Sequence, residues 1–454
     1  MEFIVSKFGG TSAATAESLQ QIEKILSMDN RRRCVVLSAP GKAKGVTIKV
    51  TDLLIAATQK ALKNEIYSHD IAALTERFRS IYQPLGLSQE RIDPIVSEIE
   101  KRLSGTKDDP RKFRDQVVAI GEELNARLFA EYLVLKGKKA VFVSPQDARL
   151  FVTPEFGDAQ PLPESSFKLA SLLKKKCAES TVVFPGFYGI TKEGDIATFS
   201  RGGSDLTGSI LAEAIDAVEY ENWTDVNGIF SANPKLIDNP EQVPALTYKE
   251  MRELSYMGFN VLHEEAVKPT MKKKIPIRLR NTFNPDNAGT LIVSQRLPSE
   301  RDVIGIASDG GYCSFSLEKF LMNREKGFGR RLLSIFEDRG LSYEHCPSGV
   351  DNMSIILDQN QLTPEAINAI IREIEDKLNP DELRTEFGIA LVAVVGEGLL
   401  HKIGVLAQAA GALSKASVNI KMVNQGSSEI SMIFGIDASD EKKAVDALYR
   451  EFFK

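Results

Sequence analysis

The strongest constraint on the fold lies at the start of the chain, where residues 5–12 read Val-Ser-Lys-Phe-Gly-Gly-Thr-Ser. Apolar residues lead into Lys7, which predicts that this lysine ends a buried strand. A helix is expected over 14–28, because apolar residues recur there at helical spacing. A strand, a glycine turn and a helix N-terminus together form an anion-binding geometry. The segment is therefore either a phosphate site served by Lys7 or a tight turn with a surface lysine.

Length and composition limit the classes of protein that this chain can belong to. A chain of 454 residues is expected to form two or three domains with sizeable cores. Its net charge of -5 argues against a nucleic-acid partner. It lacks the run of about 18 apolar residues that a membrane-spanning helix needs. The four cysteines are scattered without a Cys-x-x-Cys pair, which indicates reduced thiols and a cytoplasmic location.

A second strand, loop and helix follow the first unit. Residues 34–40 form a short apolar strand that ends in small residues, and residues 41–50 form a loop rich in lysine and glycine. Thr51 then opens a helix as its predicted N-cap. Because ligands bind at the carboxyl ends of parallel strands, this loop is expected to lie near Lys7.

The next part of the chain is predicted to be helical. Residues 64–114 are highly charged, with apolar residues at helical spacing, which indicates an antiparallel helical excursion with a solvated face. A long helix is expected over 117–135, and Glu122 lies near its start. This carboxylate either binds a ligand's ammonium group or is an ordinary helix-end charge.

Residues 198–208, Thr-Phe-Ser-Arg-Gly-Gly-Ser-Asp-Leu-Thr-Gly, form a second glycine-rich turn before a helix expected over 209–214. Arg201 is suited to gripping a carboxylate with two parallel hydrogen bonds. Asp205 is suited to orienting a lysine or a metal-bound water. The alternative is an N-cap turn with a surface ion pair, but two basic glycine-rich turns in one chain favour phosphate chemistry.

A further strand, expected over 217–223, is followed by Thr224 and Asp225. These residues are placed either for nucleotide contacts or for ordinary turn chemistry. A helix over 247–257 and strands over 275–281 and 290–294 are predicted to complete the sheet. The chain has neither the P-loop signature nor the protein-kinase signatures. The sequence His263-Glu264-Glu265 also lacks the second histidine of a zinc helix, so no metal site is predicted.

The last third of the chain repeats a pattern of its own after a polar, proline-containing boundary at 295–302. Each repeat is expected to contain a helix, two strands and a second helix. The predicted elements are 328–339, 342–346, 353–357 and 364–378 in the first repeat, and 403–415, 418–423, 430–435 and 441–453 in the second. Two such β-α-β-β-α-β units are ferredoxin-like modules, which serve in binding, in dimerisation or as a purely structural part.

Four segments together resemble the signature segments of the aspartokinases, in that family's order and over essentially the whole chain. The first two of these segments are typical of the amino-acid kinase superfamily. The Gly-Gly-Thr-Ser form of the first segment narrows the resemblance to aspartokinase. The repeat in the last third of the chain resembles the ACT-domain pair of monofunctional aspartokinases. The segments are Lys7-Phe8-Gly9-Gly10-Thr11-Ser12, Arg201-Gly202-Gly203-Ser204-Asp205, Trp223-Thr224-Asp225-Val226, and Asn419-Ile420 with Gln425-Gly426-Ser427-Ser428-Glu429.

The resemblance implies an α/β fold. A three-layer amino-acid kinase domain with a mainly parallel central sheet is expected over 1–297, followed by two ferredoxin-like ACT modules over 298–454. The first module is expected at about 303–380 and the second at about 386–454, side by side or interleaved.

The implied activity is ATP-dependent phosphorylation of the side-chain carboxylate of L-aspartate. The product is 4-phospho-L-aspartate, the first intermediate towards lysine, threonine and methionine. Mg2+ is expected to arrive with ATP and bridge its β- and γ-phosphates, without a metal site built from protein side chains. Phosphoryl transfer of this kind works by positioning and charge neutralisation.

The resemblance also assigns roles to residues of this chain. The phosphoryl group is assigned to Lys7, Gly9 and Gly10, with Asp205 orienting Lys7. Aspartate is assigned to Thr51, Glu122, Arg201, Gly203 and Ser204, with Glu122 on its ammonium group and Arg201 on a carboxylate. The nucleotide is assigned to Lys7, Gly9, Gly10, Thr224, Asp225, Phe230, Lys235 and Asn260.

Several positions depart from the family pattern. Phe230 replaces a usual tyrosine, Lys235 a usual arginine, and Asn260 a lysine that commonly touches ATP. His263-Glu264 also replaces the usual His-Pro. The nucleotide contacts therefore depart further from the family pattern than the aspartate contacts do.

An amino-acid effector, lysine, is expected at an interface between ACT modules of a homodimer or a dimer of dimers. A helix N-terminus can take its carboxylate, and Glu325 or Glu344 can take its ε-ammonium. Alternatively, these acids are solvent charges and the modules only dimerise. The expected effector residues are Met322, Glu325, Phe328, Gly329, Ser342, Tyr343 and Glu344.

Two rival functions belong to other classes. One is a kinase for another amino-acid carboxylate such as glutamate, against which the ACT pair and Glu122 argue. The other is a non-catalytic amino-acid sensor that retains the kinase fold, against which Lys7, Arg201 and Asp205 argue.

Overall fold

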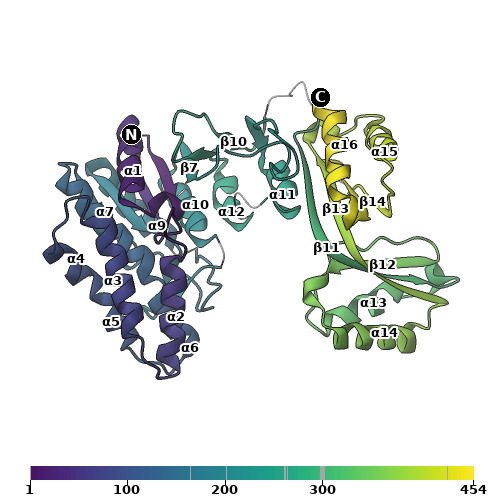
Figure 1. Ribbon diagram of the computed structural model, residues 1–454, viewed down its shortest axis with the longest axis horizontal. Helices are drawn as coiled ribbons and strands as arrows, with labels where there is room; N and C mark the ends of the chain where they lie inside the picture. The colour runs from purple at the N-terminus through teal and green to yellow at the C-terminus, as the bar shows by residue number, and fades with distance from the viewer. Residues whose placement is uncertain are drawn as a thin grey trace. The chain divides into compact units, whose positions relative to one another are not determined.

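The computed structural model describes residues 2–163, 165–200, 202–259, 262, 264–296, 302–426 and 428–454. The chain forms two compact units (Figure 1). The first contains residues 1–229, 242–251 and 260–297, and the second contains residues 230–241, 252–259 and 298–454. The second unit therefore includes two short segments that precede its main part in the sequence.

The first unit is built on an eight-stranded sheet, in the order β3-β4-β2-β1-β7-β9-β10-β8. Neighbouring strands are parallel except for the antiparallel pair β9 and β10. The carboxyl ends of β1, β2, β4, β7 and β9 therefore share one edge of the sheet. The strands are β1 (Ile4–Phe8), β2 (Arg32–Leu37), β3 (Ala140–Phe142), β4 (Thr181–Pro185), β7 (Glu219–Thr224), β8 (Ala245–Thr247), β9 (Ile277–Asn281) and β10 (Thr290–Val293).

Helices cover both faces of this sheet, which gives three layers. Side chains alternate along a strand, so Lys7 and Phe8 point to opposite faces. Phe8 packs in a core with α1, α2, α3 and α7, whereas Lys7 meets Asp205 of α10. The helices are η1 (Thr11–Ala13), α1 (Ala16–Met28), α2 (Val50–Leu62), α3 (Ser68–Tyr82), α4 (Gln89–Val96), α5 (Glu98–Leu103), α6 (Pro110–Val118), α7 (Ile120–Leu135), α8 (Pro145–Ala148), α9 (Ser165–Glu179), α10 (Gly203–Ile215) and α12 (Glu264–Lys273).

A small hairpin stands apart from the main sheet. Its strands, β5 (Tyr188–Ile190) and β6 (Ile196–Thr198), form a two-stranded antiparallel sheet, and Ile190 also makes an isolated parallel bridge to Phe151. The hairpin connects the end of β4 to the start of α10, so it lies directly before the second glycine-rich turn.

The second unit has a five-stranded antiparallel sheet, in the order β12-β11-β13-β15-β14. Its two long central strands pair along almost their whole length. The strands are β11 (Gly305–Glu318), β12 (Asn352–Asp358), β13 (Glu382–Val395), β14 (Met422–Asn424) and β15 (Ser431–Asp437), and the helices are η2 (Met322–Arg324), α13 (Phe328–Glu337), η3 (Gln359–Gln361), α14 (Pro364–Leu378), η4 (Glu397–Leu399), α15 (Val405–Lys415), η5 (Ala438–Asp440) and α16 (Glu441–Phe453). Helix α11 (Tyr248–Tyr256) begins in the first unit and ends in the second.

Two hydrophobic cores share the long strand β11. Its Ile306 packs with α15 and α16, whereas its Phe315 packs with α13 and α14. The repeated pattern in the sequence therefore folds onto one continuous sheet, in which a single strand contributes to both cores.

Two predicted helix starts are wrong. Helix α1 begins at Ala16, because Thr15 and Ser18 form a capping box and the short 3-10 turn η1 precedes it. Thr51 is not an N-cap, because α2 begins at Val50 with Lys49 in the cap position. Val50 is fully buried and its N–H donates to the Pro40 carbonyl, at 3.0 Å, which starts the helix one residue early.

Other predicted boundaries are also wrong. The helix predicted over 117–135 is two helices, with Ala119 between α6 and α7. The helix predicted over 209–214 begins at Gly203, because Gly202 takes a left-handed conformation, with φ of 76°, and starts it. The strands predicted over 275–281 and 290–294 do belong to the main sheet, as β9 and β10, but β8, which was not predicted, forms its outer edge. The strand predicted over 342–346 makes only an isolated bridge at His345, since Gln361 accepts the Ser342 N–H.

Candidate active site

Lys7 is held by two polar side chains at the carboxyl edge of the main sheet. It forms an ion pair with Asp205, the third residue of α10. The Lys7 Nζ lies 3.5 Å from Asn222 Oδ1, and the Asn222 amide donates to Asp205 Oδ1 at 2.9 Å. Lys7 and Asn222 are buried. The ammonium group therefore has a fixed position beside the glycine turn.

The glycine turn after β1 and the loop after β2 meet through backbone atoms. The Gly41 N–H donates to the Gly10 carbonyl at 2.8 Å. A Cβ atom added at Gly41 would lie 2.6 Å from the Gly10 carbonyl carbon, and one at Gly10 would lie 3.1 Å from the Ala39 oxygen. The helical turn next to the glycines is η1, whose first N–H groups are not used by the turn itself. The turn is therefore a narrow, backbone-lined cradle of the kind that accepts an anion.

Glu122 is a buried carboxylate beside this cradle. It is the third residue of α7, and a Cβ atom at the preceding Gly121 would lie 3.0 Å from the Ala39 Cβ. Among the described residues, none hydrogen-bonds to Glu122 Oε2. Burial raises the pKa of Glu122 to about 8, although the Ala39 backbone N–H favours the charged form. A buried carboxyl with an unpaired oxygen is suited to binding a cationic group.

The start of α10 is packed tightly against the end of β4. A Cβ atom at Gly186 would lie 2.4 Å from Ser204 Oγ, and one at Gly203 would lie 2.8 Å from the Phe187 ring. Phe187 has φ of 80°, a left-handed conformation that is uncommon outside glycine. Its N–H donates to Thr207 Oγ1 at 3.0 Å. Gly203 and Ser204 therefore have little freedom to move.

The remaining residues expected to bind aspartate are placed only in part. Thr51 is half-buried in the first turn of α2, which follows the loop containing Gly41. Arg201 lies outside the described residues, next to Gly202.

The residues expected to bind the nucleotide do not all lie together. Thr224 ends β7 and the exposed Asp225 follows it, and the two side chains are 3.2 Å apart. Phe230 and Lys235 belong to segment 230–241 of the second unit, where Phe230 is half-buried and Lys235 is exposed. Asn260 and His263 lie outside the described residues.

Four of the expected effector residues lie around the start of α13. Met322 and Phe328 are buried, and Gly329 is the second residue of the helix. The Glu325 carboxylate pairs with Lys319, at 2.9 Å, and with Arg331. Hydrogen bonds from these two cations lower the pKa of Glu325, so this acid is already paired.

The other three expected effector residues follow α13. Ser342 donates its N–H to Gln361 at 3.1 Å, and Tyr343 is exposed. Glu344 donates its N–H to Ile356 of β12 at 2.7 Å, while its carboxylate accepts a hydrogen bond from the Tyr256 hydroxyl.

Asn222 is a site residue that the sequence reasoning missed. It lies opposite Lys7 in the pairing of β1 with β7 and contacts both Lys7 and Asp205. The available signal was the polar pair Glu221-Asn222 between the aromatic residues Tyr220 and Trp223, since buried polar groups need a specific partner.

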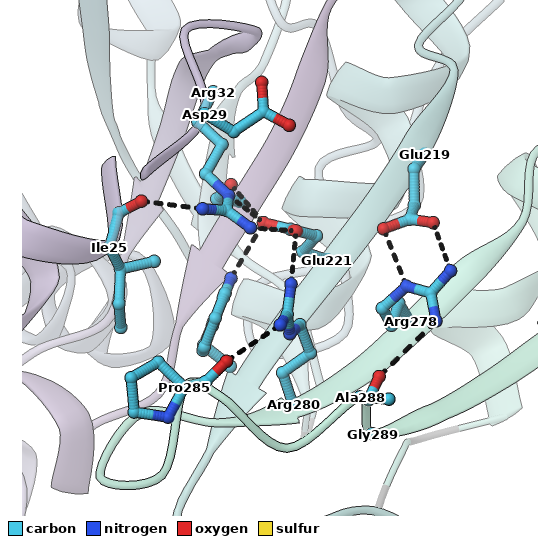
Figure 2. Close-up of polar contacts among 12 residues, drawn as sticks. Ile25, Asp29, Arg32, Glu219, Glu221, Arg278, Arg280, Pro285, Ala288 and Gly289 are labelled. Carbon is cyan, nitrogen blue, oxygen red and sulfur yellow. Dashed lines mark hydrogen bonds and ion pairs between the residues drawn. The ribbon is translucent and has the colours of Figure 1, made fainter. Parts of the chain in front are cut away.

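A second polar cluster lies on the opposite face of β1 and β7 (Figure 2). Glu221 is 1% exposed and accepts two hydrogen bonds from Arg32, at 2.8 and 2.7 Å. It also accepts from Ser6 at 2.9 Å and from the Trp223 indole at 3.0 Å. Burial acts to raise the pKa of Glu221, but the Arg32 hydrogen bonds outweigh it and the pKa is lowered. Every oxygen of this carboxylate is paired, which is the arrangement of a structural ion pair.

Comparison with known proteins gives the class to which this fold and site belong. The model of the amino acid kinase family matches residues 2–281, and a model of the ACT domain matches residues 392–452. The three-layer unit with Lys7 at the sheet edge is therefore an amino acid kinase domain, and the second unit carries an ACT domain.

Individual relatives narrow the class. The chain is 48% identical over 449 residues to aspartokinase 3 of Bacillus subtilis, covering 99% of this chain and 98% of the relative. The crystal structure of Clostridium acetobutylicum aspartate kinase matches with a TM-score of 0.88 at 36% identity, covering 99% and 100% of the two chains. Escherichia coli aspartokinase III in complex with aspartate and ADP matches with a TM-score of 0.79 at 25% identity, covering 100% of both chains. The chain belongs to the aspartokinase family and is an aspartate kinase, which confirms the resemblance and the predicted fold class.

Within the described part of the chain, no helix combines the length and the apolar character needed to cross a membrane.

Proposed function

We propose that the edge of the main sheet that holds Lys7 and Glu122 transfers the γ-phosphoryl group of ATP to the side-chain carboxylate of L-aspartate. The product, 4-phospho-L-aspartate, begins the synthesis of lysine, threonine and methionine. The observation that carries the proposal is that a fixed ammonium group and a buried, half-unpaired carboxylate both lie next to one glycine cradle. The E. coli relative solved with aspartate and ADP supports it.

Lys7, Gly9 and Gly10 hold the transferring phosphoryl group in this proposal. Asp205 and Asn222 fix the Lys7 ammonium, so it neutralises charge that develops during transfer without having to reorganise. A Cβ atom at Gly10 would fill the cradle, which fits a phosphate held by backbone N–H groups. Mg2+, carried by ATP, supplies further charge neutralisation. Thr224 and Asp225 contact the nucleotide at the same edge, and the family pattern adds Phe230, Lys235 and Asn260.

Aspartate is held by groups of opposite charge. Glu122 takes the α-ammonium, which supplies the missing partner of Oε2. Arg201 grips a carboxylate, and Thr51, Gly203 and Ser204 complete the pocket. A side-chain carboxylate oxygen of aspartate then attacks the γ-phosphorus, the bond from this phosphorus to the β,γ-bridging oxygen breaks, and ADP leaves. No covalent enzyme intermediate is needed.

Replacement of Arg201 tests the aspartate pocket. Arg201→Ala is expected to raise the KM for aspartate far more than the KM for ATP, because a bidentate carboxylate grip is lost. Trapping of the acyl phosphate as aspartyl hydroxamate measures both constants, with glutamate as the competing substrate. Equal effects on the two KM values would assign Arg201 to the nucleotide, and absence of any hydroxamate from the wild-type enzyme would favour a non-catalytic sensor.

Lysine is the proposed effector of the second unit, which acts in a homodimer or dimer of dimers. The N-terminus of α13 at Phe328 and Gly329 takes its carboxylate. Glu344 takes its ε-ammonium, since Glu325 is already paired with Lys319 and Arg331. Inhibition requires that lysine bind an inactive arrangement more tightly, with a coupling of about 1–3 kcal/mol.

Glu344→Ala tests the effector assignment. The variant is expected to need a higher lysine concentration for inhibition, because the ε-ammonium loses its partner, while its activity without lysine serves as the reference. Threonine, which lacks the ε-ammonium, is the control ligand. If millimolar lysine, alone or with threonine, leaves the wild-type enzyme unchanged, the effector assignment is wrong and the kinase assignment stands.

We propose a cytoplasmic location for this enzyme. The cysteines Cys34, Cys177, Cys313 and Cys346 are all free, and the first three are buried, which suits a reducing compartment.

A further inference from the structure

The hairpin of β5 and β6 needs anchors, because a two-stranded sheet is barely stable alone. Asp115 of α6 supplies one of them. Its Oδ2 accepts the N–H of Thr198, the last residue of β6, at 2.7 Å and the N–H of Gly157 at 2.8 Å. Asp115 has no exposed surface. One buried carboxylate oxygen of Asp115 therefore joins the end of the hairpin to the loop that contains Gly157, which lies 42 residues after Asp115 in the sequence.

A second anchor comes from Glu123 of α7. Its Oε2 accepts a hydrogen bond from the hydroxyl of Tyr188, the first residue of β5, at 3.1 Å. Arg102 of α5 pairs with the same Glu123 oxygen. Tyr188 lies opposite Thr198 in the hairpin, so the two anchors hold the same end of it. Glu123 also follows Glu122 directly, which ties the hairpin to the helix that carries the proposed ammonium site.

The anchored end of the hairpin is where the second glycine-rich turn begins. Four residues, 199–202, connect Thr198 to the first residue of α10. The five steps from Thr198 to Gly203 span at most about 18 Å, so the end of β6 and the start of α10 cannot move far apart. The Phe199 N–H also donates to the Phe187 carbonyl at 2.9 Å, beside Gly203. A displacement of Thr198 is therefore passed to the turn that contains Arg201 and Ser204.

We propose that Asp115 is a positioning residue for aspartate binding: it holds the end of β6 and so sets where the turn over 199–205 presents its side chains. The inference rests on the proposed roles of Arg201 and Ser204. Asp115 does not touch the substrate, so it acts through geometry alone. Since a misplacement of about 1 Å is costly in an active site, loss of this anchor weakens aspartate binding.

The test compares Asp115→Ala with Asp115→Asn. The alanine variant loses both backbone acceptor contacts, and we expect a rise of about tenfold in the KM and the Kd for aspartate, with a change of less than about twofold in the KM for ATP. The asparagine variant keeps an acceptor oxygen and is expected to stay within about threefold of the wild type. Calorimetric titration with aspartate in the absence of ATP measures the Kd directly.

Two further variants keep the test decisive. Tyr188→Phe removes only the second anchor, keeps the packing and folds even if Asp115→Ala does not; its KM for aspartate is expected to rise about threefold. Glu219→Ala removes an ion pair with Arg278 at the far end of β7 and is the control for a general loss of stability. Its KM for aspartate is expected to match the wild type.

The inference fails if Asp115→Ala folds and its KM for aspartate stays at the wild-type value while Arg201→Ala raises that KM. If Asp115→Ala does not fold, the same comparison is made with Tyr188→Phe. It also fails if Glu219→Ala raises the KM for aspartate as much as Asp115→Ala does, because the effect would then be one of stability. If Arg201→Ala itself leaves the KM for aspartate unchanged, the proposed pocket is wrong and the inference falls with it.

Discussion

Two buried glutamates of the first unit differ in almost every respect except burial. Glu221 accepts hydrogen bonds from Arg32, Ser6 and Trp223, and its pKa is lowered. Glu122 has an oxygen with no partner among the described residues, and its pKa is raised to about 8. A buried carboxylate is costly unless it is paired. The carboxylate of Glu221 is paired by side chains of the protein, whereas the carboxylate of Glu122 is available to pair with a cationic group of a bound ligand.

This difference separates a structural acid from a functional one without reference to any relative. The polar cluster around Glu221 is complete, and Figure 2 shows Arg32 and Arg280 converging on this carboxylate. The surroundings of Glu122 are incomplete among the described residues, because its Oε2 has no hydrogen-bond partner there. The comparison predicts opposite effects when each acid is made neutral.

The largest effect is expected on stability at Glu221. Glu221→Gln leaves Arg32 buried without its counter-charge, so the free energy of unfolding at pH 7 should fall by about 3–4 kcal/mol. Because the folded-state pKa of Glu221 is lowered, its contribution is present at neutral pH and is lost as the pH falls below the unfolded value near 4.5. Urea unfolding at pH 7 and pH 4 measures both. Unchanged stability at pH 7 would show that the paired acid is not structural.

The next effect is on catalysis at Lys7. Lys7→Ala should lower kcat by about a hundredfold or more with the fold intact, because a preorganised charge contact to the transferring phosphoryl group is lost. Steady-state release of ADP gives the rate, and circular dichroism checks folding. Arg278→Met, on the other face, is the control and should keep the wild-type kcat. Turnover like that of the wild type in Lys7→Ala would remove this lysine from the mechanism.

A smaller effect of opposite sign is expected on stability at Glu122. Its folded-state pKa lies above the ordinary value of 4.5, so the stability it contributes is complete below about 4.5 and is lost as the pH rises to about 8. Glu122→Gln should therefore stabilise the substrate-free enzyme at pH 8, by about 2 kcal/mol, and change little at pH 4.5. Thermal unfolding of the variant and the wild type at the two pH values measures this difference in stability. If the variant is less stable than the wild type at pH 8, Glu122 is a structural acid like Glu221.

Much of this arrangement was predictable from the sequence. Lys7 after an apolar strand, the two glycine-rich turns and Asp205 all belong to local patterns, and the structure places Lys7 and Asp205 in contact. The helices over 364–378 and 441–453 were predicted with correct boundaries, because a strong apolar periodicity is bounded by clear start signals.

The remaining features depend on contacts between distant residues. Val50 displaced Thr51 from the cap position because its N–H meets Pro40. The strand expected over 342–346 does not form a regular ladder, because the Ser342 N–H donates to the Gln361 side chain. Asp115 bonds to Thr198, 83 residues away, and no local signal marks it as an anchor. The unpaired oxygen of Glu122 is likewise a property of the packed fold, since the sequence shows only an acid near a helix start.

The affinity for aspartate as a function of pH tests the central claim that Glu122 is kept unpaired for the substrate ammonium. Tyr188, a neighbouring titratable group, has a pKa raised well above its usual range by burial, so it does not titrate in this window. If free Glu122 has a pKa of about 8 and ionises on binding, the Kd for aspartate should fall about fiftyfold from pH 6 to pH 8, with one proton released per aspartate at the lower pH.

Calorimetry in buffers of different ionisation enthalpy measures both the Kd and the proton release. Glu122→Gln, the matched control, should bind aspartate weakly at every pH and release no proton. A wild-type Kd that is independent of pH, with no proton released, would contradict the account.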